Sequence, residues 1–214
     1  MGATGSEYVW FEELFPDLAE ACCLTLVEGL DPDEVLRRLG GSEAPSLTGA
    51  TAITEAAFAM PEESDGRRQL LAMAQLGSWT LVVEPNGYLG VTEDRALPAS
   101  AGTRWISHFV NINGVDAWVW AEDGDLRLAF EPTLPESRRG SDPDGYVDAM
   151  RAAGFDFAPD PPDDYVPARA CFAFAEHLTG VVLTAGVFER TAFRCGSAPI
   201  RMPPTVTSTG AGSR

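Results

Sequence analysis

Two turn dipeptides, Asn113-Gly114 and Asp123-Gly124, constrain the fold of this chain more than any other feature of its sequence. Asn-Gly and Asp-Gly are the strongest short-range signals for a two-residue β-hairpin loop, because both loop positions need a positive φ angle. The stretches on either side of the dipeptides are rich in β-branched and aromatic residues, which favour strands. The sequence therefore predicts an antiparallel three-stranded meander over about residues 103–131.

Two-residue loops would also set the register of this meander, and side chains alternate between its two faces. In that register one face is apolar and includes a single histidine, His108, so we expect it to face the core. The other face mixes large rings with charged groups, and its partner-binding candidates are Trp105, Phe109, Trp118, Trp120, Glu122 and Arg127. Covered by a helix, these rings would add cross-strand packing; left open, they would form a surface that anchors a partner protein.

The chain around the meander predicts an α+β fold, with an antiparallel sheet packed against N- and C-terminal helices. Before residue 60 the pattern is helical, because Leu18, Cys22 and Leu26 follow at a spacing of four and Asp31-Pro32 provides a second helix start. Further strands are expected over 70–76, 79–84 and 88–91, further helices over 53–58, 93–99, 142–153, 168–179 and 184–190, and loops over 42–50 and beyond Glu131. This organisation predicts one domain over residues 7–195 and a disordered tail over 196–214.

The balance of charge restricts the partners that this chain could bind. Its 15 basic residues against 32 acidic residues leave a formal net charge of −17, which repels phosphate backbones and argues against nucleic-acid binding. The same charge favours solubility and would speed the encounter with a basic protein. All the basic residues are arginine, so chemistry that requires a lysine, such as a Schiff base or a phosphate-binding P-loop, is excluded.

The sequence carries no pattern for a metal, a cofactor or a membrane anchor. Its four cysteines lack zinc spacing and are predicted to be free thiols in the core. The N-terminus lacks the basic and apolar regions of a signal peptide, and no apolar run reaches the roughly 18 residues that span a bilayer. We therefore expect a cytoplasmic protein that has no cofactor and no contact with a membrane.

Catalytic motifs are absent from the sequence, so no catalytic residue is assigned. There is no GxSxG elbow, and no residue is placed beside His108 or His177 to act with it. His108 is expected to be a buried, hydrogen-bonded core residue, and His177 a partly exposed helix residue. The pattern favours a protein that is not an enzyme.

Several stretches taken together resemble a known domain family. They include the segment from Cys23 to Leu30, the strand from Trp79 to Gly87, and the run Trp118-Val119-Trp120-Ala121-Glu122-Asp123-Gly124, and the resemblance extends over about residues 8–190. The family is an uncharacterised actinobacterial domain of unknown function. The resemblance implies an actinobacterial source and a shared fold, and it implies no activity, because the family supplies no catalytic residues to carry over.

The sequence favours a protein-interaction module, in the manner of an immunity or antitoxin protein that binds a basic partner through the aromatic and acidic face of the meander. A second hypothesis is a small-molecule-binding accessory protein or enzyme, with a pocket between sheet and helices that uses His108, Arg104 or Arg127. A third is a structural subunit of a larger assembly, and the oligomeric state is left open. Replacing His108 with alanine separates the first two: loss of ligand binding in a folded protein favours the pocket, whereas unfolding indicates a core residue.

Overall fold

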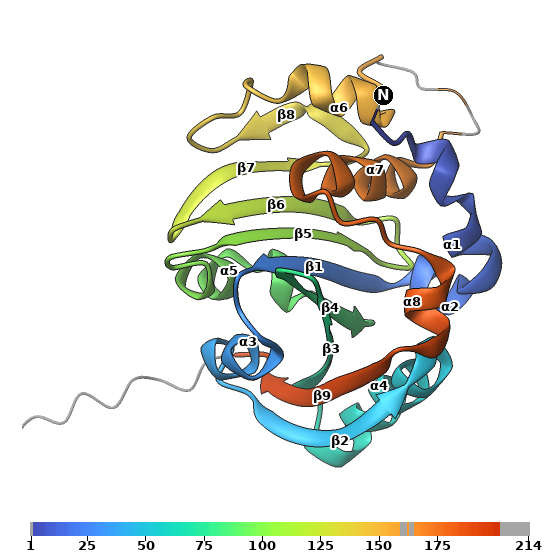
Figure 1. Cartoon of the computed structure of the whole chain (residues 1–214), viewed down its shortest axis with the longest axis vertical. Helices are drawn as coiled ribbons and strands as arrows, with labels where there is room; N and C mark the ends of the chain where they lie inside the picture. The colour runs from blue at the N-terminus through green and yellow to red at the C-terminus, as the bar shows by residue number, and fades with distance from the viewer. Residues whose placement is uncertain (1, 159–161, 163–164, 202–214) are drawn as a thin grey trace, which may run out of the picture.

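A computed structural model describes residues 2–158, 162 and 165–201 of the chain. Within these residues the framework is a single sheet of nine antiparallel strands, in the order β2-β9-β3-β4-β1-β5-β6-β7-β8 (Figure 1). Helices cover the sheet, which confirms the predicted α+β class with the meander packed against N- and C-terminal helices. No helix in the described part of the chain has the length and apolar character needed to cross a bilayer.

Four of the eight connections between successive strands are short, and the other four contain helices. The strands are β1 (Cys22–Glu28), β2 (Ser42–Thr48), β3 (Arg68–Leu76), β4 (Trp79–Pro85), β5 (Arg104–Val110), β6 (Asp116–Glu122), β7 (Asp125–Glu131), β8 (Leu134–Arg139) and β9 (Ala192–Pro199). The helices are α1 (Val9–Leu14), α2 (Pro16–Glu20), α3 (Pro32–Arg38), α4 (Gly49–Ser64), α5 (Glu93–Ala99), α6 (Val147–Ala153), α7 (Pro167–Thr179) and α8 (Ala185–Arg190), with the 3-10 helices η1 (Gly5–Tyr8) and η2 (Leu89–Val91).

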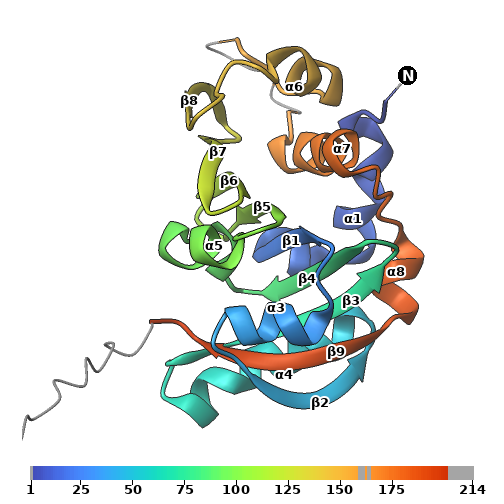
Figure 2. The ribbon, with the colours of Figure 1, turned by 60° about the vertical axis from the view of Figure 1, so that its left-hand side comes forward.

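Two hydrophobic cores lie on opposite faces of the sheet. The helices α1, α4, α6, α7 and α8 contribute to one core, and α3, α5 and η2 contribute to the other. Figure 2 shows α5 and α7 on opposite sides of the sheet. Strand β1 lies between β4 and β5, and the two cores cover its two faces, so that its residues are buried from Cys22 to Val27.

The central strand β1 corrects the predicted N-terminal helix. The helix α2 ends at Glu20, and the chain is extended from Cys22 onward. A strand that is covered on both faces has a continuous apolar run without polar alternation, and such a run also satisfies a helical spacing of four. The spacing of Leu18, Cys22 and Leu26 was therefore compatible with both structures, and the helix prediction over 22–28 is wrong.

The meander is confirmed as β5, β6 and β7, but its first hairpin has a different loop from the one predicted. The N–H of Asn111 donates to the carbonyl of Val115 (3.0 Å), and the Asn111 side chain accepts the N–H groups of Asn113 (2.9 Å) and Val115 (3.1 Å). These bonds enclose a three-residue loop, in which Gly114 alone has a positive φ, of 70°. The second turn, Asp123-Gly124, has two positive φ angles and is the two-residue loop that was expected.

A one-residue shift in register exchanges the two faces of a strand. Trp118 pairs with His108, and Trp120 pairs with Ile106, so the first core receives both of these rings. A bulge in β7 opposite Trp120 and Ala121 adds a second shift, between β6 and β7. The predicted division into an apolar face and an aromatic face is therefore wrong, because each core receives residues from both of the predicted sets.

Local signals placed several other elements correctly and misplaced four. The strands over 70–76 and 79–84 and the helices over 53–58, 93–99, 168–179 and 184–190 are confirmed, as is the helix that starts at Asp31-Pro32. The expected strand over 88–91 is the 3-10 helix η2, and β2 and β8 form where loops were predicted. Helix α6 begins at Val147 rather than at residue 142. Strand β9 continues to Pro199, beyond the predicted domain end at 195, and the tail from residue 202 lies outside the described residues.

Candidate functional site

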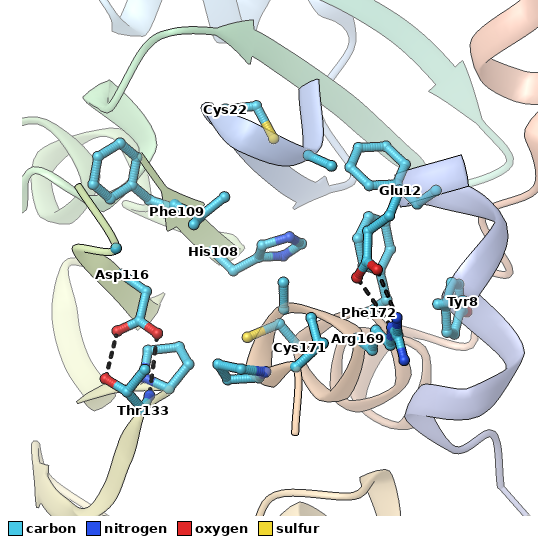
Figure 3. A pocket seen from close by; sticks show the side chains of 18 residues that line it. Tyr8, Glu12, Cys22, His108, Phe109, Asp116, Thr133, Arg169, Cys171 and Phe172 are labelled. Atoms are coloured by element: carbon cyan, nitrogen blue, oxygen red, sulfur yellow. Dashed lines mark hydrogen bonds and ion pairs between the residues drawn. The ribbon is translucent and has the colours of Figure 1, made fainter. Parts of the chain in front are cut away.

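An apolar cavity of about 310 Å³ opens between one end of the sheet and the helices that cover it. β1, β5 and β6 form its sheet side, while η1, α1 and the N-terminal part of α7 form its helical side (Figure 3). The residues that bring polar atoms to it are Tyr8, Glu12, Cys22, His108, Asp116, Thr133, Arg169 and Cys171. A mainly apolar cavity of this size with a few polar groups is typical of a small-ligand site.

His108 extends from β5 into this cavity (Figure 3). Its ring is only 5% exposed and lies edge-on to Phe172, with 4.9 Å between the ring centroids, and parallel to Trp118, with 6.4 Å. Burial lowers its pKa from 6.5 to about 4, so the imidazole is neutral near pH 7 and offers one hydrogen-bond donor and one acceptor. The predicted burial is confirmed, but within the described residues neither ring nitrogen has the expected hydrogen-bond partner.

Asp116 begins β6 on the same face of the sheet as His108. Its carboxylate accepts the backbone N–H of Thr133 (3.1 Å) and the Thr133 hydroxyl (3.2 Å), as the dashed lines in Figure 3 show. Burial, with a smaller contribution from the charge of Glu131, raises the pKa of Asp116 to about 6, although the two bonds from Thr133 oppose the rise. Asp116 is therefore mostly ionised at neutral pH, and each of its oxygens already accepts a bond.

An ion pair closes the helical side of the cavity. The guanidinium of Arg169 donates through Nη2 to Glu12 Oε2 (2.6 Å) and through Nε to Oε1 (3.0 Å). This bidentate contact joins α1 to the first turn of α7. Beside it, the Tyr8 hydroxyl donates to Glu176 Oε2 (2.6 Å), and burial raises the pKa of Tyr8. These contacts between α7 and the N-terminal segment hold the cavity wall in place.

Two cysteine thiols line the cavity, but their surroundings do not activate either of them as a nucleophile. Cys22 and Cys171 are both buried, and burial raises the pKa of Cys22 to about 12 and that of Cys171 well above its usual value. Nucleophilic catalysis needs the thiolate, which these surroundings disfavour at neutral pH. No cluster of three potential metal ligands occurs within the part of the chain that the structure describes.

The three tryptophans among the predicted partner-binding residues are core residues. Trp105 and Trp118 are fully buried and Trp120 is 3% exposed. Trp105 lies in the second core, where its Nε1 donates to the carbonyl of Gly90 (2.9 Å), and the other two lie in the first core. The sheet therefore separates these rings, and they do not form one exposed surface.

The charged candidates lie away from the cavity. Glu122 and Arg127 form an ion pair of 3.7 Å between Oε2 and Nε at the other end of the meander. Arg104 donates to both oxygens of Glu28 (2.6 and 2.8 Å) and lies over the ring of Trp79. Of the predicted site residues, only His108 and the half-buried Phe109 line the cavity.

Sequence reasoning missed most of the polar residues that join His108 at this site. Glu12 and Arg169 are far apart in the sequence, and no local signal connects them. Asp116 could have been found, because a three-residue loop after Asn111 would have placed it on the same face as His108. The Asn-Gly dipeptide alone did not distinguish between the two loop lengths.

The structure is that of an α+β protein with an apolar cavity between its antiparallel sheet and α7. The chain belongs to DUF6461, a family of unknown function whose profile matches residues 1–203. No curated protein and no solved structure matches the chain. This membership confirms the predicted resemblance to a family of unknown function. Because the family supplies no function, we infer one from the residues of the cavity.

Acid is expected to destabilise the protein through His108. Because the folded-state pKa of about 4 lies below the ordinary 6.5, the contribution of the neutral ring is complete above pH 6.5 and is lost as the pH falls towards 4, by about 3 kcal/mol. Urea denaturation at pH 7 and pH 4.5 should show this loss in the wild type but not in His108→Gln. Asp116 titrates in the opposite sense and is common to both proteins. An equal acid effect in the two proteins would contradict a buried neutral His108.

Proposed function

We propose that the protein binds a small molecule with an apolar body and one neutral polar group, in the cavity between the sheet and α7. The observation that carries this proposal is His108, whose ring lines an apolar cavity and has no hydrogen-bond partner among the described residues. A ligand with a matching donor or acceptor would pair with this ring, and its apolar body would fill the remaining space.

The charges around the cavity support a neutral ligand rather than an anion. Asp116 and Glu12 both line it, and the guanidinium of Arg169 is already engaged by Glu12. An anionic ligand would therefore approach the carboxylate of Asp116, whose hydrogen-bond partner Thr133 is neutral, and this repulsion costs free energy. A hydroxyl, carbonyl or amide group meets no such repulsion and pairs with either nitrogen of the neutral His108 ring.

The same residues favour binding over catalysis. Burial disfavours the thiolates of Cys22 and Cys171, and a histidine with a pKa near 4 is a weak general base at neutral pH. Among the described residues, no carboxylate is hydrogen-bonded to His108 to orient it, as a catalytic histidine needs. We therefore place the protein among small-molecule-binding proteins.

Filling the cavity is expected to abolish binding while the protein stays folded. Ala168 lines the cavity from the first turn of α7 and is half-buried, so Ala168→Phe places a ring in the open space. The neutral dye Nile red, whose emission rises in apolar sites, should bind the wild type and bind Ala168→Phe at least about tenfold more weakly. The matched control is Ala52→Phe, at a half-buried alanine on α4 outside the cavity.

The dye experiment has a clear opposing result. Equal emission from the wild type, Ala168→Phe and Ala52→Phe would mean that the dye binds outside the cavity or not at all. Circular dichroism and the thermal midpoint of each variant show whether it is folded. A folded Ala168→Phe protein with unchanged dye affinity would refute the proposed site.

A protein-interaction role is the second candidate, and exposed apolar side chains near the cavity favour it. Ile112 and Val115 are 73% and 55% exposed on the β5–β6 loop, and Leu134, at the start of β8, is 48% exposed. On an acidic chain, such a surface suits a basic partner with an apolar anchor. Replacing Ile112 and Val115 with serine should abolish capture of a partner from native lysate, whereas Val182→Ser should not; unchanged capture would exclude this surface.

A cytoplasmic location and an actinobacterial source stay predictions from the sequence.

A further inference from the structure

The arginines of this acidic chain divide into two groups. In the described part of the chain, eleven arginines lie within 4.0 Å of a carboxylate, and only Arg68, Arg95 and Arg201 do not. With 32 acidic residues in the sequence, an arginine without such a partner is unusual. All three lie around the same place, where β3 begins and β9 ends.

A surface groove of about 920 Å³ occupies this place. Its lining residues are Gly40, Gly66, Arg67, Arg68, Tyr88, Pro199, Ile200 and Arg201. The pairing of β3 with β9 explains why the arginines meet: Arg68 lies opposite Pro199, and Ile200 donates its N–H to the carbonyl of Arg67 (2.9 Å). The groove shares no lining residue with the cavity that contains His108.

Arg68 lines this groove, and among the described residues only neutral groups hold its guanidinium. Its Nε donates to Ser197 Oγ (2.9 Å), and its Nη2 donates to Ser42 Oγ (2.8 Å) and to the carbonyl of Ser197. These bonds use three of the five N–H groups of the guanidinium, and the two on Nη1 have no acceptor among the described residues. The guanidinium is therefore fixed in place, with its charge uncompensated and two donors available to an anion.

A second arginine, which is buried, holds the walls of the groove. Arg95 is 6% exposed and donates through Nη1 to the carbonyls of Pro199 and Ile200 and through Nη2 to the carbonyl of Leu39. These bonds tie the end of β9 to the segment that precedes Gly40. On another side, the Gln69 side chain accepts the N–H of Tyr88 (3.3 Å). The groove is thus formed before any ligand arrives, which lowers the entropic cost of binding.

We propose that this groove binds a phosphorylated small molecule, such as a nucleoside diphosphate. A phosphate group offers oxygens to several guanidinium groups at once, and Arg67, Arg68 and Arg201 line one groove. Arg67 also contacts Asp65, but both side chains are more than 70% exposed, so the pair is weak. Tyr88 is 41% exposed beside Ile200 and Pro199 and offers an aromatic surface to a planar ring. The net charge of −17 repels a nucleic acid and tolerates a small ligand with few charges.

Isothermal titration with ADP and with pyrophosphate tests this groove directly. Arg201 makes no hydrogen bond or ion pair with the described residues, so Arg201→Gln keeps the fold and should weaken both ligands. Arg68→Gln should weaken both ligands by roughly tenfold or more, since it removes a fixed charge-assisted donor. The matched control is Arg190→Gln on α8. The Arg190 side chain is 77% exposed and, among the described residues, pairs only with the neighbouring Glu189, so this variant should bind as the wild type does. Tyr88→Ala should weaken ADP and leave pyrophosphate unchanged.

Two results would overturn the proposal. One is the absence of a binding signal for ADP, pyrophosphate and inorganic phosphate at millimolar concentration in the wild type. The other is equal affinity for ADP in the wild type, Arg68→Gln and Arg201→Gln. Because the groove and the cavity share no residue, Ala168→Phe should bind ADP normally, so failure of either site is distinguishable from failure of the other.

Discussion

Replacing Trp118 with alanine is expected to lower the free energy of unfolding by roughly 3–5 kcal/mol, which is the usual cost of removing a large buried ring. Trp118 is fully buried, and its ring centroid lies 4.9 Å from that of Phe174 on α7 and 5.9 Å from that of Phe130 on β7. The ring therefore joins the meander to α7, the helix that forms one wall of the cavity. Urea denaturation followed by circular dichroism measures the loss.

The matched substitution Trp118→Phe is expected to cost less than half as much. Within the described residues the indole Nε1 is buried without a hydrogen-bond partner, which costs the folded wild type roughly 1–3 kcal/mol. Phenylalanine keeps part of the aromatic packing and removes this unpaired donor. An alanine variant as stable as the wild type would place the ring on the surface and would return it to the partner-binding candidates.

Replacing Glu84 with alanine is expected to lower the free energy of unfolding by about 3 kcal/mol or more. Glu84 is the fully buried penultimate residue of β4, and its carboxylate accepts the backbone N–H of Leu89 (2.8 Å), the N–H of Gly90 (2.9 Å) and the side-chain amide of Gln69. Truncation leaves these buried donors unpaired, at roughly 1–3 kcal/mol each. The 3-10 helix η2 should lose its shape, which amide hydrogen exchange at Leu89 and Gly90 would report.

The stability that depends on Glu84 should fall as the pH rises. Burial raises the pKa of Glu84 from 4.5 to about 7, while bonds from Leu89, Gly90 and Gln69 oppose the rise. The folded protein thus holds the proton more tightly than the unfolded chain, so the contribution is greatest below pH 4.5 and is lost by about pH 7, by about 3 kcal/mol.

The variant Glu84→Gln does not titrate and provides the reference for this pH dependence. The free-energy difference between the wild type and Glu84→Gln should favour the wild type more at pH 5 than at pH 8. A difference that is constant across this range would show that Glu84 keeps one protonation state. The sign is opposite to that expected for His108, so the two groups can be told apart in one titration series.

Two elements with short-range signals were predicted from the sequence with the right type and position. The carboxylate of Asp31 accepts the N–H of Glu34 (2.8 Å) and caps α3, and Asp123-Gly124 forms the expected two-residue turn. Both depend on backbone preferences and bonds within a few residues. The central strand β1 was misassigned, because its burial on both faces comes from strands and helices elsewhere in the chain.

The site was accessible to sequence reasoning only in part. His108 was a candidate for a pocket between sheet and helices, and it does line such a cavity. Its neighbours depended on the register of the β5–β6 hairpin, where the side chain of Asn111 supports a loop one residue longer than expected. That single residue brings Asp116 and Trp118 to the face of His108 and takes Trp118 from a proposed surface into the core.

By itself, the sequence determined the α+β class, the meander, the acidic charge and most of the helices, because these follow from composition and from interactions between near neighbours along the chain. The tertiary structure alone decided which rings are buried, that Glu12 and Arg169 meet beside His108, and that Arg68 and Arg201 share a groove without a carboxylate partner. These features arise from burial and from contacts between distant segments, and their energies have no counterpart in any short stretch of the chain.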